Sequence, residues 1–200
     1  MFNYIEGKIV EKNPAFVVID VNGIGFGLNI SLNTYTKLEN QSNAKLLTHM
    51  AFKVEATNPV GIELFGFSDE EERSLFRHLI GVSRVGMNTA MVMLSSLHPN
   101  EIFKAIANED FKTLQTIKGI GAKAAQRIVM ELKDKVGKEY QALDKMEASY
   151  NLNKEEALSG LVMLGFNRNQ AGKALDKIAG RKDGDKLAVE QLIKEALKLL

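Results

Sequence analysis

The stretch that decides the fold is IKGIGAKAAQRI, residues 117–128. It places a Gly-Ile-Gly turn between two segments whose apolar residues have helical spacing. Glycines let the backbone turn tightly, so the amides at the start of the second helix point outward at the positive end of the helix dipole. Such a helix start binds phosphate. We therefore expect the backbone of Gly119, Ile120 and Gly121 to contact a phosphate.

Positive side chains flank this turn. Lys118 and Lys123 add mobile charges beside the amides, and Arg127, one turn after Lys123, can reach a neighbouring phosphate. Ile120 should plug into the core and fix the turn. A helix-hairpin-helix motif of nucleic-acid-binding proteins looks like this. The alternative is that the glycines only cap a helix and the cations are solvated surface; a single copy does not separate the two interpretations.

A second copy of the motif lies earlier in the chain, in SRVGMNTA, residues 83–90. Its Gly86 stands 35 residues before Gly121, and an apolar segment with helical spacing follows each glycine. Arg84 replaces the first glycine of the motif, which leaves open whether this hairpin still binds phosphate. Two copies are too few for a helical solenoid. The first hairpin adds four residues to the expected DNA contacts: Arg84, Val85, Gly86 and Asn88.

The first third of the chain, to about Phe67, is built from short β-branched and aromatic runs. Asn22-Gly23 tolerates the positive φ of a tight hairpin turn, so strands near 14–21 and 25–31 should pair antiparallel. About five strands would close a small barrel. The sequence thus predicts an all-β domain at the N-terminus.

Helical spacing takes over after Phe67. Ser68 and Glu71 form a capping box, in which each side chain can satisfy an amide at a helix start. Apolar periodicity lapses over residues 139–152, which favours a flexible linker. Gly165 is a plausible helix stop in the last unit, where helices near 154–164, 168–179 and 186–199 predict a small three-helix bundle.

The predicted fold class is therefore α+β multidomain. Its four segments are a β-barrel at 1–66, a tandem helix-hairpin-helix DNA-binding domain at 67–138, a flexible linker at 139–152 and a three-helix domain at 153–200.

Composition excludes several kinds of site. The formal net charge is +1, so the whole chain has no strong positive electrostatic field that would indicate a nucleic-acid partner. Any basic surface must be local. Cysteine is absent, which excludes disulfides, thiolate zinc sites and thiol nucleophiles and fits a cytoplasmic protein. The N-terminus lacks the pattern of a signal peptide, and no apolar run approaches the roughly 20 residues that span a bilayer.

Motifs for catalysis are also missing. No G-x-x-x-x-G-K-[ST] phosphate loop occurs, so intrinsic ATPase activity is not expected. The acidic run at 70–72 suits the first turn of a helix better than paired-carboxylate catalysis. The histidines lack the close spacing of metal ligands: His49, His78 and His98. We expect no catalytic residue, no cofactor and no bound metal.

Several stretches in order resemble the RuvA family, bacterial subunits that bind Holliday junctions. These are GKIVEK at 7–12, VNGIGF at 21–26, LFGF at 64–67, ERSLF at 72–76, GIGAK at 119–123, RIVMELKDK at 127–135 and Leu164-Gly165-Phe166. The match is specific in combination, and it runs the length of the first two units.

The resemblance implies an oligonucleotide-binding (OB)-type barrel, a tandem helix-hairpin-helix domain and a mobile C-terminal bundle that docks on the hexameric ATPase RuvB. Four subunits would form a homotetrameric platform that holds a four-way junction open, with the RuvC resolvase as a further partner. Whether one tetramer or two, as an octamer, grip the junction stays open. By resemblance the motor-binding face would include Leu161, Leu164 and Phe166; alternatively these residues are only the core of the bundle.

The family also carries an acidic pin on the barrel, usually two adjacent acids between two strands. Here the corresponding stretch, residues 54–61, offers Glu55 alone and is longer than usual, with Glu63 further on. Glu55 is our hypothesis for the pin, although a single charge repels phosphate less than two do.

The predicted function is sequence-independent binding of Holliday junctions by a non-catalytic subunit that recruits and orients RuvB for branch migration in recombination and DNA repair. One rival is a hairpin-containing glycosylase or nuclease, which would need a catalytic cluster beyond the second hairpin. Another is a protein-interaction scaffold, whose DNA binding would be weak and indifferent to branching.

Overall fold

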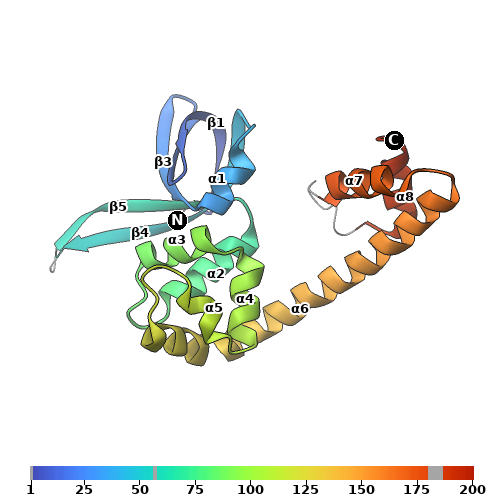
Figure 1. The fold of residues 1–200 in the computed structure, drawn as a ribbon. Helices are drawn as coiled ribbons and strands as arrows, with labels where there is room; N and C mark the ends of the chain where they lie inside the picture. Colours follow the sequence, from blue (N-terminus) through green and yellow to red (C-terminus); the bar gives the residue numbers. More distant parts are fainter. Residues whose placement is uncertain (1, 56–57, 180–186) are drawn as a thin grey trace. The chain divides into compact units, whose positions relative to one another are not determined.

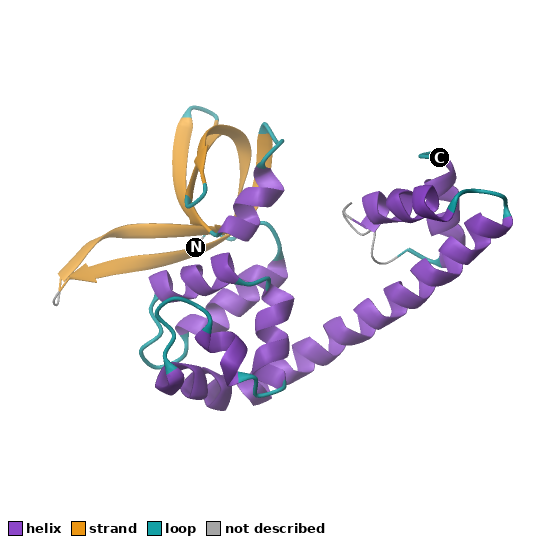
Figure 2. Ribbon diagram, viewed as in Figure 1, coloured by secondary structure: helices purple, strands orange, loops and turns teal. Residues whose placement is uncertain are grey.

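The structure is a computed structural model that describes residues 2–55, 58–179 and 187–200, with the side chains of all these except 53–60 and 137–151. The chain divides into two compact units, Met1–Gly137 and Lys138–Leu200. All strands of the described residues lie in the first unit, and the described part of the second unit is helical (Figure 2).

Five strands close into a barrel with the order β1-β2-β3-β5-β4, which confirms the predicted all-β domain (Figure 1). Alternate apolar side chains point inward and form its core, led by Val17, Ile19, Leu28 and Leu46. A short helix, α1 (Leu32–Leu38), follows β3. The strands are β1 (Tyr4–Asn13), β2 (Phe16–Val21), β3 (Ile24–Ile30), β4 (Asn43–Glu55) and β5 (Asn58–Phe67).

The hairpin between β2 and β3 forms as the sequence predicts. Asn22 and Gly23 both have positive φ, 53° and 88°, and Val21 pairs with Ile24 across the turn. Two positive φ values match the twist of antiparallel strands, which explains why the Asn-Gly pair sets this register.

Strands β4 and β5 extend beyond the rest of the barrel as a two-stranded arm (Figure 1). Pairing between them continues from Leu47 opposite Phe67 to Glu55 opposite Asn58. Phe52 pairs with Ile62 on this arm, and Ile62 is largely exposed.

The helices of the first unit pack around a second apolar core. Helix α2 begins one residue later than predicted: its N-cap is Asp69, whose carboxylate accepts from the amide of Glu72 at 2.9 Å. The capping box of Ser68 and Glu71 is therefore wrong, because the more strongly accepting Asp69 carboxylate takes the cap. The helices are α2 (Glu70–Ile80), α3 (Met87–Ser96), α4 (Pro99–Ala107), α5 (Phe111–Gln115) and α6 (Ala122–Met163).

A buried carboxylate joins α2 to the barrel. Glu72 is 1% exposed and accepts hydrogen bonds from the hydroxyls of Ser31 and Thr34, which lie at the start of α1. Burial raises the pKa of Glu72 above its ordinary value, and nearby Asp69 raises it further, while the two hydroxyl donors oppose the rise. Beside it, Arg73 donates to the carbonyl of Asn3 at 2.9 Å.

Helix α6 is longer than the sequence suggests, because its backbone stays helical through residues 139–152. The lapse in apolar periodicity predicted a flexible linker there, which is not what this backbone shows. The stretch contains no glycine or proline and is rich in Ala, Leu, Glu, Lys and Gln, whose intrinsic helix propensity is high. A sequence of this composition can continue a helix through its intrinsic propensity, without the apolar periodicity of a helix that packs on a core. The domain boundaries themselves stay a prediction.

The second unit is a small helical bundle made of the end of α6, α7 (Arg168–Ala179) and α8 (Val189–Leu197). Gly165 ends α6 as expected: its φ is 95°, and its amide donates to the carbonyl of Val162 at 3.0 Å. The core consists of buried side chains from all three helices, among them Leu161, Leu175 and Leu192.

Candidate nucleic-acid interface

The two predicted hairpins have the same backbone turn, 35 residues apart. In the first, the amide of Val85 donates to the carbonyl of Val82 at 3.0 Å. In the second, the amide of Ile120 donates to the carbonyl of Ile117, also at 3.0 Å. All four of these side chains are buried, so they anchor each turn to the helical core.

A helix begins directly after each turn. The amide of Ala90 bonds to the carbonyl of Gly86, and the amide of Ala125 bonds to the carbonyl of Gly121, both at 3.0 Å. Helix geometry leaves the preceding amides without an intrahelical acceptor. At α3 no side chain caps them either, since the N-cap residue is Gly86. Both helix starts therefore offer backbone donors to a ligand.

Space is open in front of both N-terminal glycines. A Cβ added to Gly86 or Gly121 would meet nothing within 4 Å, and neither residue has a positive φ. The fold thus does not need glycine at either position. The space in front of the two helix starts is therefore open to solvent.

The two turns differ in the residue that takes the left-handed conformation. It is Gly119 in the second hairpin, with φ of 91°, and Arg84 in the first, with φ of 67°. A side chain in this region costs about 1–2 kcal/mol. The altered first hairpin therefore keeps the backbone of the second in spite of its sequence.

The predicted contact residues fall into two groups. Val85 and Ile120 are 7% and 4% exposed, so they could contact DNA only through the backbone, and Ile120 plugs into the core as expected. The side chains with polar or charged ends are exposed around the two turns: Arg84, Asn88, Lys118 and Lys123.

Arg127 is half-buried and already has a protein partner. Its Nη1 donates to the carbonyl of Ser83, in the first hairpin, at 3.2 Å. A guanidinium has five N–H donors, so others remain for a phosphate. This link between the hairpins has no signal in the local sequence, because it joins residues 44 positions apart.

Three domain families match the chain. They are "RuvA N terminal domain" over residues 1–66, "SAM-like Helix-hairpin-helix tandem" over 76–134 and "RuvA, C-terminal domain" over 153–200. Proteins named "Holliday junction branch migration complex subunit RuvA" match over the whole chain. Those of Christiangramia forsetii and Flavobacterium psychrophilum are 46% identical and that of Cytophaga hutchinsonii 42%, each over all of this chain and all of the relative. The chain belongs to the RuvA family.

The RuvA acidic pin was predicted at Glu55. This residue ends β4 opposite Asn58, at the tip of the arm, but its side chain lies outside what the structure describes. Residues 56 and 57 lie outside the described residues altogether. The assignment of Glu55 stays a prediction.

The residues predicted to bind the partner motor of RuvA proteins have different environments. Leu161 is fully buried in the core of the bundle, and Phe166 packs against that core. Leu164 is 62% exposed, and Met163 beside it is 90% exposed. A surface contact in this region would therefore centre on Leu164, with Leu161 supporting it from within.

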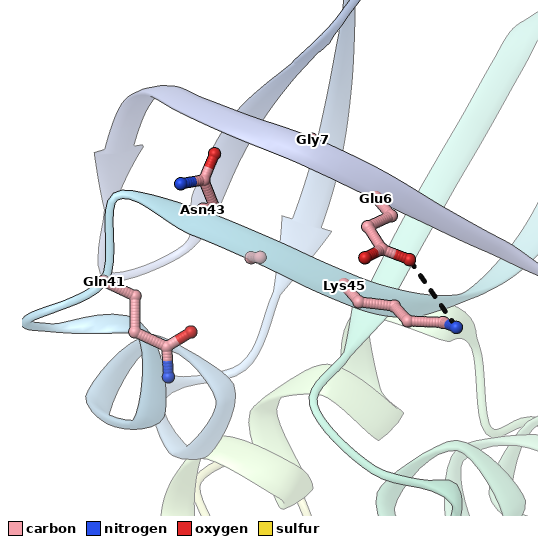
Figure 3. Close-up of a pocket in the computed structure, with 6 residues that line it drawn as sticks. Glu6, Gly7, Gln41, Asn43 and Lys45 are labelled. Atoms are coloured by element: carbon pink, nitrogen blue, oxygen red, sulfur yellow. Dashed lines mark ion pairs between the residues drawn. The ribbon is translucent and has the colours of Figure 1, made fainter.

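The barrel carries a shallow hollow of about 380 Å³ (Figure 3). The two charges that face it satisfy each other: Lys45 Nζ lies 3.6 Å from Glu6 Oε2 and 4.1 Å from the centre of the Tyr4 ring. The hollow therefore supplies no charged anchor for a small ligand. It is lined by Glu6, Gly7, Gln41, Asn43, Ala44 and Lys45.

The described residues contain no group of three or more His, Asp or Glu side chains placed to hold a metal ion. None of their helices is both long and apolar enough to cross a membrane.

Proposed function

We propose that this protein binds four-way DNA junctions by their shape, as a homotetrameric platform that recruits and orients the RuvB ATPase for branch migration in recombination and DNA repair. The observation that carries the proposal is the pair of helix starts at Gly86 and Gly121, both with open space before the amides. The names of its full-length relatives, which are branch migration complex subunits, support the same function.

Binding of this kind does not read sequence. Backbone amides and the cations Lys118 and Lys123 all suit phosphate oxygens, which are alike at every base pair. Such contacts fix the position of a protein on a duplex, so a preference for junctions must come from how several subunits place their hairpins. This is why the proposal includes a tetramer, with an octamer on DNA as a further state.

The other predicted roles follow from family membership. ATP hydrolysis would reside in RuvB, and this chain would contribute no catalytic group. Glu55 would act as the pin at the crossover, and the surface around Leu164, backed by Leu161 and Phe166, would contact RuvB. RuvC would be a further partner, and the complex would act in the cytoplasm.

The test is a competition gel shift with the full chain, using a labelled four-way junction against unlabelled linear duplex of identical sequence. We expect the complex with the labelled junction to persist in a large excess of unlabelled duplex. The affinity for the junction should fall steeply with salt, because each phosphate contact releases counterions. Equal competition by duplex would remove the platform and favour the scaffold interpretation. Cleavage or base release without RuvB would favour the enzyme interpretation.

A further inference from the structure

The loop of the first hairpin is held by the helix of the second. Ser83 directly precedes Arg84, and both of its backbone polar groups bond to α6. Its carbonyl accepts from Arg127 Nη1 at 3.2 Å, and its amide donates to Glu131 Oε2 at 3.4 Å. Arg127 and Glu131 are four residues apart and so lie on one face of the helix.

This contact acts where the first hairpin is strained. The φ of Arg84 is 67°. This angle describes the rotation, about the N–Cα bond of Arg84, of the peptide plane that contains the Ser83 carbonyl. A bond to that carbonyl fixes the plane, and the bond from the Ser83 amide fixes the plane before it. Strained backbone persists when its surroundings over-determine it, and the two side chains of α6 do this.

The arrangement is not repeated in the second hairpin. The residues 35 positions before Arg127 and Glu131 are Val92 and Ser96. Valine has no hydrogen-bonding group, and the Ser96 hydroxyl donates to the Val92 carbonyl of its own helix at 2.7 Å. The second hairpin has Gly119 in the left-handed position, so its turn is unstrained without such support.

We propose that Glu131 is a positioning residue for DNA binding: with Arg127, its carboxylate holds the Ser83 peptide so that the amides at the start of α3 face a phosphate. The inference rests on the proposed function. Glu131 itself does not touch DNA, and an acid near DNA should repel it. If Glu131 positions the hairpin, removing its side chain should weaken DNA binding. If its charge only repels DNA, removing it should strengthen DNA binding.

The test compares Glu131→Ala with Glu131→Gln in the full chain. Both remove the charge, but glutamine keeps an oxygen that can accept from the Ser83 amide. We expect Glu131→Ala to bind the junction about tenfold more weakly, as for one lost hydrogen bond to a charged group. Glu131→Gln should bind at least as tightly as the wild type, because it keeps the acceptor and loses the repulsion. Asp134→Ala, which removes an exposed acid from the same helix, should also bind at least as tightly.

A second readout needs no DNA. Hydrogen exchange of the Val85 amide reports the first turn, and that of the Ile120 amide reports the second, since each donates within its own turn at 3.0 Å. We expect Glu131→Ala to speed exchange at Val85 about tenfold and to leave Ile120 unchanged, with wild-type rates in Glu131→Gln. Thermal unfolding checks that each variant is folded.

The two readouts separate the two proposals. If the wild type fails to prefer junctions while Val85 exchange responds as expected, the proposed function is wrong and the positioning role stands. If the wild type binds junctions but Glu131→Ala binds as tightly or more tightly, with unchanged exchange at Val85, the positioning role is wrong.

Discussion

The first and second hairpins reach one backbone turn by different means. The second has the local sequence for it, with Gly119 in the left-handed conformation. The first has Arg84 there and is held from α6, where Arg127 and Glu131 bond to the backbone of Ser83. A turn can thus be specified by a residue's own conformational freedom or by the contacts around it.

The difference has a consequence for function. A turn held by its own sequence depends little on the rest of the molecule, whereas a turn held by tertiary contacts follows whatever those contacts do. We therefore expect the second hairpin to keep its turn in any folded variant that leaves its own residues unchanged. The first hairpin should bind only while its support on α6 is intact.

The largest effect should come from filling the open space in front of the N-termini of α3 and α6 with side chains. We expect Gly86→Ala with Gly121→Ala to weaken junction binding by at least about 100-fold, because two charge-assisted hydrogen-bond sites are blocked in each subunit. Stability should stay the same or rise by about 0.5 kcal/mol, since neither glycine has a positive φ and neither new Cβ meets an atom. Gel shifts and urea unfolding measure the two effects.

The single variants then test whether the hairpins are equivalent in binding. If Gly121→Ala alone removes most of the affinity and Gly86→Ala changes nothing, the first hairpin does not bind phosphate and the equivalence fails. Similar losses from the two variants would establish that the tertiary supports replace glycine fully.

A smaller effect should distinguish the two left-handed positions. Gly119→Ala places a Cβ at φ of 91° and should lower the free energy of unfolding by about 1–2 kcal/mol. Arg84→Gly relieves a similar strain but adds freedom to the unfolded chain, so its net effect should lie within about 0.5 kcal/mol of zero. Urea unfolding at neutral pH measures both. A large loss in Arg84→Gly would mean that the arginine side chain, not its backbone, stabilises the turn.

The same contrast explains what the sequence predicts and what it does not. The hairpin at Asn22-Gly23, the stop at Gly165 and the turn at Gly119 are all correct, because each depends on a glycine or asparagine that accepts a positive φ. The offset of 35 residues also survives in the structure, since buried apolar positions repeat with it.

Features that depend on distant partners were missed. Glu72 was expected only to complement a helix dipole, and its bonds to Ser31 and Thr34 join residues about 40 positions apart. The link from Glu131 to Ser83 spans 48 positions. Neither has a local signature, because a glutamate on a helix is usually solvated. For Leu161 the sequence left both a core and a surface position open, since a helical stripe does not say which of its members faces the core.

The smallest effect concerns another tertiary contact, the one that Glu72 makes between α2 and the barrel, and it depends on pH. Burial raises the pKa of Glu72 above the ordinary 4.5, so the folded state favours the protonated form. Its contribution to stability is fully present below that ordinary pKa and is lost as pH rises through the raised value. Asp69 behaves in the opposite way: although burial alone would raise its pKa, hydrogen bonds from Lys37 and the Glu72 amide lower it below 3.8. Its contribution is therefore lost only as pH falls through that lowered value.

Because these two windows do not overlap, the difference between wild type and Glu72→Gln above the ordinary pKa of 4.5 isolates one carboxyl. We expect the stability of the wild type relative to Glu72→Gln to fall as pH rises through this range, measured by urea unfolding at each pH. Other groups that titrate there are common to both proteins and cancel. Asp69→Asn should show no such trend relative to wild type in the same range. A parallel pair of curves for wild type and Glu72→Gln would mean that Glu72 stays charged when buried, so that its contact between α2 and the barrel would not weaken with pH.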